Sequence, residues 1–140
     1  MRQILLFAAL AASLALLSGC TLSKAKADTA EDMSDKAAYH KLSAEEAYEM
    51  MASQEVVVVD VRTREEYDGG HIENAVLVPN ESIGSEIPEA LPDKEATLLV
   101  YCRSGRRSKD AAQKLLALGY QSVYDFGGVI DWPYELVKEG

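Results

Sequence analysis

The stretch Val56-Val57-Val58-Val59 is an unbroken run of β-branched residues. Such a run is typical of a strand that is buried on both faces, as in the centre of a parallel sheet. Apolar stretches at 75–78 and 97–101 predict two more strands, and 122–124 predicts a short fourth one. Because helical patterns separate these strands, the sequence predicts an α/β fold with helices on both faces of a parallel sheet.

Capping boxes mark the starts of two predicted helices. Ser43 stands three positions before Glu46, and Thr63 stands three positions before Glu66. In this pattern the hydroxyl and the carboxylate each accept a backbone N–H at the helix start. Gly69-Gly70 is expected to end the second helix.

The remaining elements follow from spacing. Residues 39–42 are predicted to form an opening strand, and 83–91 a weak helix. Apolar residues between 111 and 118 recur at helical spacing, which predicts a helix that begins near Arg106 or Arg107. Gly119 then suits the position just past the helix end.

The N-terminus has the pattern of a targeting segment. Arg2 precedes an apolar stretch, 4–17, that is too short for the roughly 20 residues of a membrane span but typical of a signal peptide. Leu17-Ser18-Gly19-Cys20 resembles the lipobox of bacterial lipoproteins. That resemblance implies that residues 1–19 are removed and that Cys20 is lipidated. Ordinary secretion with cleavage near Gly19 is the alternative.

The composition fits a tethered acidic domain. Residues 20–38 are polar and without an apolar period, so we expect a lipidated N-terminus with a flexible tether, followed by one domain at 39–140. A lipid anchor would hold it on the extracytoplasmic side of a membrane. The net charge of −9 argues against nucleic acid as a partner, because phosphates select for clustered Lys and Arg.

The predicted reactive group is Cys102, which follows the strand at 97–101. Ligands of open α/β sheets bind beyond the carboxyl ends of the strands. A helix N-terminus nearby offers free N–H groups that stabilise a thiolate, so we expect Cys102 to be largely ionised at neutral pH. The alternative is an inert cysteine that packs in the core. Arg103, Arg106 and Arg107 are expected to bind an anion, and Ser104-Gly105 to let the chain curl tightly before the helix.

An ordered set of residues, spread over 39–140, resembles the rhodanese domain. Its members are Asp60-Val61-Arg62, Glu66-Tyr67, Gly70-His71-Ile72, Ala75, Pro79-Asn80, Tyr101 to Ser108, Gly127-Gly128 and Trp132. The resemblance implies a three-layer α/β/α domain with a parallel five-stranded sheet. It also implies a six-residue loop, Cys102 to Arg107, that cradles a persulfide.

The resemblance further implies a sulfurtransferase. The Cys102 thiolate would take the outer sulfur of a thiosulfate-like anion and pass it to cyanide or a thiol. The loop would bind the donor through its N–H groups and guanidinium groups, and Asp60 and Arg62 would form a supporting network. We expect a monomer without a metal or other cofactor. Physiological donor, acceptor and pathway stay open.

Three alternatives remain. A phosphatase or arsenate reductase on the same fold needs five residues between Cys and Arg, whereas four separate Cys102 from Arg107 and Ser108 follows. A non-catalytic persulfide carrier would have the same loop. A thiol redox role is weakened because no resolving cysteine lies nearby. A catalytic base is the alternative role for His71, which the resemblance assigns to a structural turn. Gly127-Gly128, Trp132 and Tyr134 are predicted to be C-terminal packing and turn residues.

Overall fold

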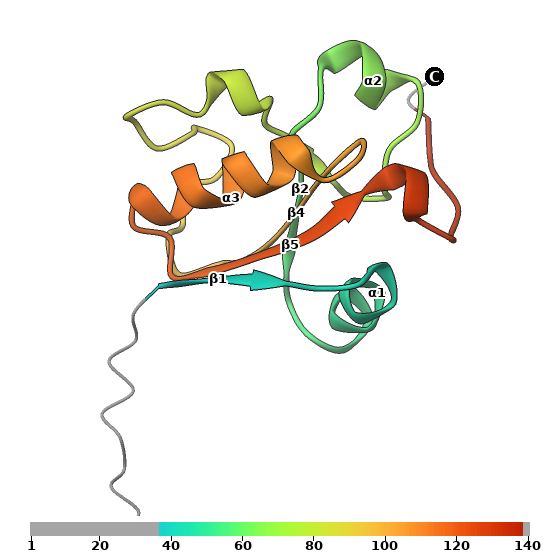
Figure 1. The fold of residues 1–140 in the computed structure, drawn as a ribbon, viewed down its shortest axis with the longest axis horizontal. Coiled ribbons are helices and arrows are strands. Elements are labelled where there is room, and N and C mark those ends of the chain that lie inside the picture. Colours follow the sequence, from blue (N-terminus) through green and yellow to red (C-terminus); the bar gives the residue numbers. More distant parts are fainter. Residues whose placement is uncertain (1–36, 139–140) are drawn as a thin grey trace, which may run out of the picture. The chain divides into compact units, whose positions relative to one another are not determined.

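The computed structural model describes residues 37–138, so the predicted signal peptide, the predicted lipidation at Cys20 and most of the predicted tether lie outside the described residues. Five parallel strands form one sheet in the order β1-β5-β4-β2-β3 (Figure 1). Their bounds are β1 Ala38–Lys41, β2 Val57–Asp60, β3 Val76–Leu77, β4 Thr97–Cys102 and β5 Ser122–Gly128. This is the predicted parallel α/β architecture.

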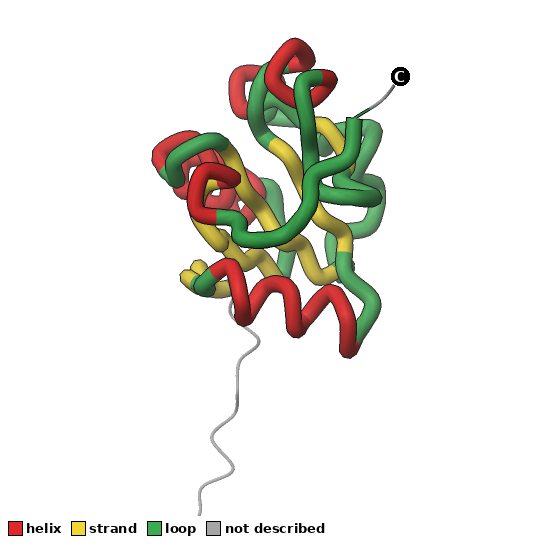
Figure 2. Tube along the Cα trace, turned by 90° about the vertical axis from the view of Figure 1, so that its right-hand side faces the viewer, coloured by secondary structure: helices red, strands yellow, loops and turns green. Residues whose placement is uncertain are grey.

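Three α-helices accompany the sheet: α1 Ala44–Ser53, α2 Arg64–Asp68 and α3 Arg106–Ala117. Single 3-10 turns occupy Asn80–Ser82 and Val129–Asp131. In the view turned by 90°, helices lie on both sides of the strands (Figure 2). Within the described residues, no helix is both long and apolar enough to cross a membrane.

Both predicted capping boxes are present. The Ser43 hydroxyl accepts the Glu46 N–H at 3.1 Å, and the Glu46 carboxylate accepts the Ser43 N–H at 2.7 Å. Thr63 and Glu66 form the same reciprocal pair at the start of α2. These contacts satisfy N–H groups that the first helical turn leaves without a partner.

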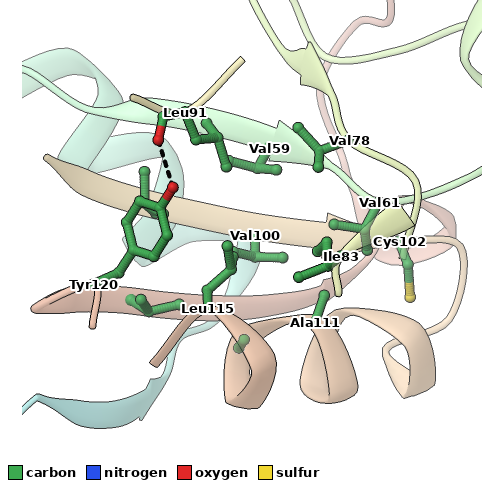
Figure 3. Packing of buried hydrophobic residues seen from close by; sticks show 13 residues of the cluster. Val59, Val61, Val78, Ile83, Leu91, Val100, Cys102, Ala111, Leu115 and Tyr120 are labelled. Atoms are coloured by element: carbon green, nitrogen blue, oxygen red, sulfur yellow. Dashed lines mark hydrogen bonds between the residues drawn. The ribbon is translucent and has the colours of Figure 1, made fainter. Parts of the chain in front are cut away.

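Two hydrophobic clusters, one on each face of the sheet, explain the unbroken valine run. Val59 packs on one face with Leu115 of α3, and Val58 packs on the other with Ala47 of α1. Figure 3 shows the first cluster, with Cys102 at one end of the packed row. The central strands therefore need apolar side chains at odd and even positions alike.

The predicted helix over 83–91 is wrong. This segment is a loop whose ends are anchored by the buried side chains of Ile83 and Leu91. Pro88 lacks an N–H, and its ring would clash with the carbonyl of Gly84 in a helix. Ile87 is exposed, so the segment has no continuous apolar face.

Strand β5 runs past the predicted end at 124. It continues to Gly128, with a register shift opposite Val100 and Tyr101 of β4. Gly127 adopts a left-handed φ of 90° there. The two glycines therefore lie within β5 rather than in the predicted turn.

Candidate active site

Cys102 is the last residue of the central strand β4 and is 1% exposed. It packs with the α3-side cluster, as a core cysteine would. Its sulfur differs from a purely apolar one, because Sγ accepts the backbone N–H of Gly105 at 3.0 Å. Gly105 has a left-handed φ of 99°, which lets the chain curl around the sulfur before α3 begins.

The surroundings of Cys102 favour its thiolate. Burial raises the pKa of the Cys102 thiol, but hydrogen bonds from the backbone and hydroxyl of Ser108 and from the N–H groups of Gly105 and Ser104 outweigh it. The pKa of the thiol therefore lies below its ordinary value. Hydrogen bonds that favour the charged form have this effect, and they make the sulfur a better nucleophile near neutral pH.

Gly128 packs closely against the backbone of the loop. A Cβ at this position would lie 2.2 Å from the Arg103 carbonyl oxygen and 2.6 Å from the Ser104 Cα. Backbone atoms cannot yield as a flexible side chain would, so any larger residue at 128 would displace the loop. The Arg103 carbonyl also accepts the Ile130 N–H at 3.2 Å, which holds the loop to the segment after β5.

Arg107, one of the three loop arginines, is occupied by an ion pair. Its two terminal nitrogens donate to the two oxygens of Glu66, each at 2.8 Å. These hydrogen bonds lower the pKa of the Glu66 carboxyl to about 2, although partial burial opposes the shift. The pair joins the start of α3 to α2. The main role of the Arg107 side chain is therefore to hold the loop in shape.

Replacing Glu66 with glutamine should lower the free energy of unfolding at pH 7 by about 1–2 kcal/mol, because a charge-assisted pair is lost. The folded-state pKa lies below the ordinary value, so the contribution is present above about pH 4.5 and is lost as the pH falls towards 2. Urea unfolding at pH 7 and pH 2 measures this. The exposed neighbour Glu65, changed to glutamine, is the control. If the difference in free energy of unfolding between wild type and Glu66→Gln were as large at pH 2 as at pH 7, the account would be contradicted.

Arg103 and Arg106 are the loop's exposed guanidinium groups. Within residues 37–138, neither forms an ion pair. Arg103 and Arg62 share the lining of a hollow of about 320 Å³, whose other lining residues are Glu65, Glu66, Gly69, Gly70, Val129, Ile130 and Leu136. A larger hollow of about 840 Å³ includes Tyr48, Trp132 and Tyr134 but no residue of the loop. We place the chemistry at the loop, since reactivity depends on the sulfur and not on cavity size.

Asp60 and Arg62 form a buried ion pair with a bond of 2.6 Å, and the Tyr101 hydroxyl donates to the same Asp60 oxygen at 2.6 Å. Arg62 also donates to the Gly70 carbonyl at 2.8 Å. The network joins β2, β4 and the turn after α2. It includes the residue just before Cys102, but among residues 37–138 none of its hydrogen bonds reaches the Cys102 sulfur.

His71 and Trp132 occupy structural positions. The His71 ring stacks on the Tyr67 ring with 3.6 Å between the ring centroids, and its Nδ1 lies 2.9 Å from the Tyr67 carbonyl oxygen. The backbone of His71 pairs with that of Val137. Trp132 is buried against Phe126. Neither contacts the loop around Cys102 through these interactions.

Sequence reasoning missed two site residues, Ser108 and Asp125. Ser108 is fully buried in the first turn of α3, and its hydroxyl donates to the buried Asp125 carboxylate at 2.7 Å. Ser108 directly follows the loop, and that position was the available signal. Asp125 lies in β5, 17 positions after Ser108. Glu66 was predicted only as a helix cap, and its pairing with Arg107 was not expected.

Comparisons with known proteins agree with this fold. The model of the Rhodanese-like domain family matches residues 43–133. A solved rhodanese from E. coli is 35% identical, with a TM-score of 0.55, over 61% of this chain and 100% of that one. A thiosulfate sulfurtransferase from Pseudomonas aeruginosa is 28% identical, with a TM-score of 0.63, over 73% of this chain and 21% of that one.

Curated relatives include a tRNA uridine(34) hydroxylase from Yersinia pestis. It is 32% identical over 106 residues, which are 72% of this chain and 30% of the relative. The chain thus spans about 30% of the length of the curated relatives it matches.

Proposed function

The chain belongs to the rhodanese-like domain family, a family of the sulfur-transfer type, and on that premise we propose that it moves sulfane sulfur from a thiosulfate-like donor to a thiophilic acceptor. The carrier of the sulfur is a persulfide on Cys102. The observation that carries the proposal is the Cys102 sulfur at the end of β4, hydrogen-bonded by the Gly105 N–H at 3.0 Å. That environment stabilises a negative sulfur.

In the first step the Cys102 thiolate attacks the outer sulfur of the donor. A new S–S bond forms to Cys102, the donor's own S–S bond breaks, and sulfite leaves with the electron pair. The Cys102 persulfide retains one negative charge, so charge balances and no external oxidant is needed. This is covalent catalysis by an activated thiolate.

In the second step the acceptor attacks the outer persulfide sulfur. With cyanide, thiocyanate leaves and the Cys102 thiolate returns; with a thiolate, the acceptor becomes the persulfide. Both steps keep an anionic sulfur at Cys102, where N–H groups of the loop favour it. Proton abstraction from the reactants is not required.

The exposed guanidinium groups of Arg103 and Arg106 favour a doubly charged donor. Arginine forks match the oxygens of sulfonate-like groups, and neither side chain is committed to an ion pair among the described residues. This supports thiosulfate rather than an uncharged donor.

The proposed location is extracytoplasmic, with the domain held on a membrane by lipid on Cys20 and the tether at 20–38. The support is the sequence pattern around Leu17 to Cys20. Mass spectrometry of the mature N-terminus tests it. A diacylglyceryl group on Cys20 supports the proposal, and an unmodified cysteine or a different start contradicts it.

A thiosulfate:cyanide assay on the full-length chain tests the function, with thiocyanate as the readout. Mercaptopyruvate and a small aryl phosphate serve as comparison substrates. We expect catalytic turnover with thiosulfate and none with the phosphate. A single round of sulfur loading without turnover would favour the carrier alternative, and absence of both loading and turnover would contradict the proposal.

A further inference from the structure

The aromatic hollow is the cavity of about 840 Å³ that is lined by Tyr48 of α1 and by Trp132 and Tyr134 of the segment after β5. The Tyr48 and Tyr134 rings stack with 3.9 Å between their centroids, and the Trp132 ring lies edge-on to both. Tyr48 is 45% exposed and Tyr134 is 36% exposed. The two tyrosine rings are therefore held against each other and still offer open surface to a ligand.

The charged residues that line the aromatic hollow are both acidic. They are the exposed residues Glu73 and Glu135, and among residues 37–138 no Lys, Arg or His lines the hollow. Neither carboxylate forms an ion pair within that range. Partial burial raises the pKa of the Tyr134 hydroxyl, and the negative charges of Glu45 and Glu49 raise it further. The field at this wall therefore favours a positively charged ligand.

The Trp132 side chain leaves a hydrogen-bond donor unpaired at the wall of the hollow. Trp132 is 8% exposed, and its buried Nε1–H has no hydrogen-bond partner within residues 37–138. Most buried donors in folded proteins are paired, so such a group requires an explanation. A ligand that carries an oxygen acceptor as well as a positive charge would match both features of this wall.

We propose that the aromatic hollow is a binding site for a small organic cation, whose alkylated ammonium group lies against the Tyr48 and Tyr134 rings with Glu73 and Glu135 alongside. The negative face of an aromatic ring attracts a cation that lies within about 6 Å of its centroid. The alkyl groups contact the rings, while the charge interacts with the rings and the carboxylates.

The size and place of the hollow fit this assignment. Its volume lies in the range of about 300–1,000 Å³ that is usual for small-molecule sites. It shares no residue with the loop from Cys102 to Arg107. The cation site is thus a function beyond the proposed sulfur transfer and does not rest on it.

Choline and its neutral analogue dimethylbutanol, in which a carbon atom replaces the nitrogen, test the role of charge at constant shape. Isothermal titration calorimetry with the full-length chain should show saturable binding of choline, and binding of dimethylbutanol that is weaker by about tenfold. Trp132 is the only tryptophan of the chain, so its fluorescence should change over the same range of choline concentration. Equal binding of the two compounds, or no binding of choline, would overturn the proposal.

Two changes at the wall locate the binding. Tyr134→Leu removes a ring but keeps an apolar side chain, and it should weaken choline binding by about three- to tenfold. Tyr134→Phe keeps the ring and should bind choline nearly as the wild type does. Thermal unfolding confirms that both variants are folded. If the two variants bind choline equally well, the ring does not hold the cation and the proposal fails.

The carboxylates are tested by the double variant Glu73→Gln with Glu135→Gln. At low salt it should bind choline about fivefold more weakly, and its binding of dimethylbutanol should not change. The matched control is Glu86→Gln with Glu89→Gln, which removes two exposed carboxylates that do not line the hollow. A control that weakens choline binding as much as the first double variant would show a general charge effect and contradict the site.

A second copy of the chain is the alternative occupant of an exposed aromatic surface. Analytical ultracentrifugation of the full-length chain distinguishes the two. A monomer supports the cation site, whereas self-association that Tyr134→Leu abolishes would make the hollow an interface between copies and overturn the proposal. None of these readouts involves Cys102, so a failure of the proposed sulfur transfer would leave the cation site intact.

Discussion

Replacing Cys102 with serine should reduce thiosulfate:cyanide transfer by about 10⁴-fold or more, because loss of a nucleophile removes the covalent step itself. Serine preserves the size of the side chain at a position that is 1% exposed. The serine hydroxyl stays protonated near neutral pH. The loop, in contrast, directs the Gly105 N–H at the position of an anionic sulfur. Initial rates of thiocyanate formation measure the change.

Cys20 supplies the matched control, since the chain has two cysteines. Cys20→Ser should leave the rate of transfer unchanged, while thermal unfolding confirms that both variants are folded. Substantial transfer by the Cys102→Ser variant would contradict the assignment of the nucleophile.

Replacing Asp60 with alanine should lower the free energy of unfolding by about 3–5 kcal/mol, because it leaves an uncompensated buried charge on Arg62. Asp60 is 0% exposed and Arg62 is 5% exposed. The change also removes the acceptor of the Tyr101 hydroxyl, which lies in β4 next to Cys102. Urea unfolding at neutral pH measures the loss.

Arg64→Ala is the control for this prediction. Arg64 and Asp68 form an exposed ion pair at 3.5 Å, on the surface of α2. Such pairs contribute little, so the variant should unfold close to wild type. A loss for Asp60→Ala no larger than that for Arg64→Ala would show that the buried network does not support the fold.

The sequence patterns predicted those elements of the fold that are determined by residues close together in the chain. The capping boxes at Ser43 and Thr63 lie within a single helical turn, and the valine run at 56–59 needs burial on both faces wherever it lies. The start of α3 after Gly105 likewise follows from neighbouring residues. The loop at 83–91 misled the prediction because its spacing is weakly helical while Pro88 forbids a helix.

The contacts that shape the site could not be predicted this way. Arg107 meets Glu66 from 41 positions away, and Ser108 meets Asp125 from 17 positions away. Both contacts depend on how elements pack after the sheet has formed. The register shift between β4 and β5, which follows the pairing of Val100 with Asp125, was not predicted either.

The central claim is that sulfur is carried on Cys102, and peptide mass spectrometry tests it most directly. The full-length chain is treated with thiosulfate, digested under conditions that preserve persulfides, and compared before and after addition of cyanide. The account predicts that the peptide with Cys102 gains the mass of one sulfur atom and loses it to cyanide as thiocyanate. A Cys102 peptide that gains no sulfur while the chain still forms thiocyanate would contradict the account.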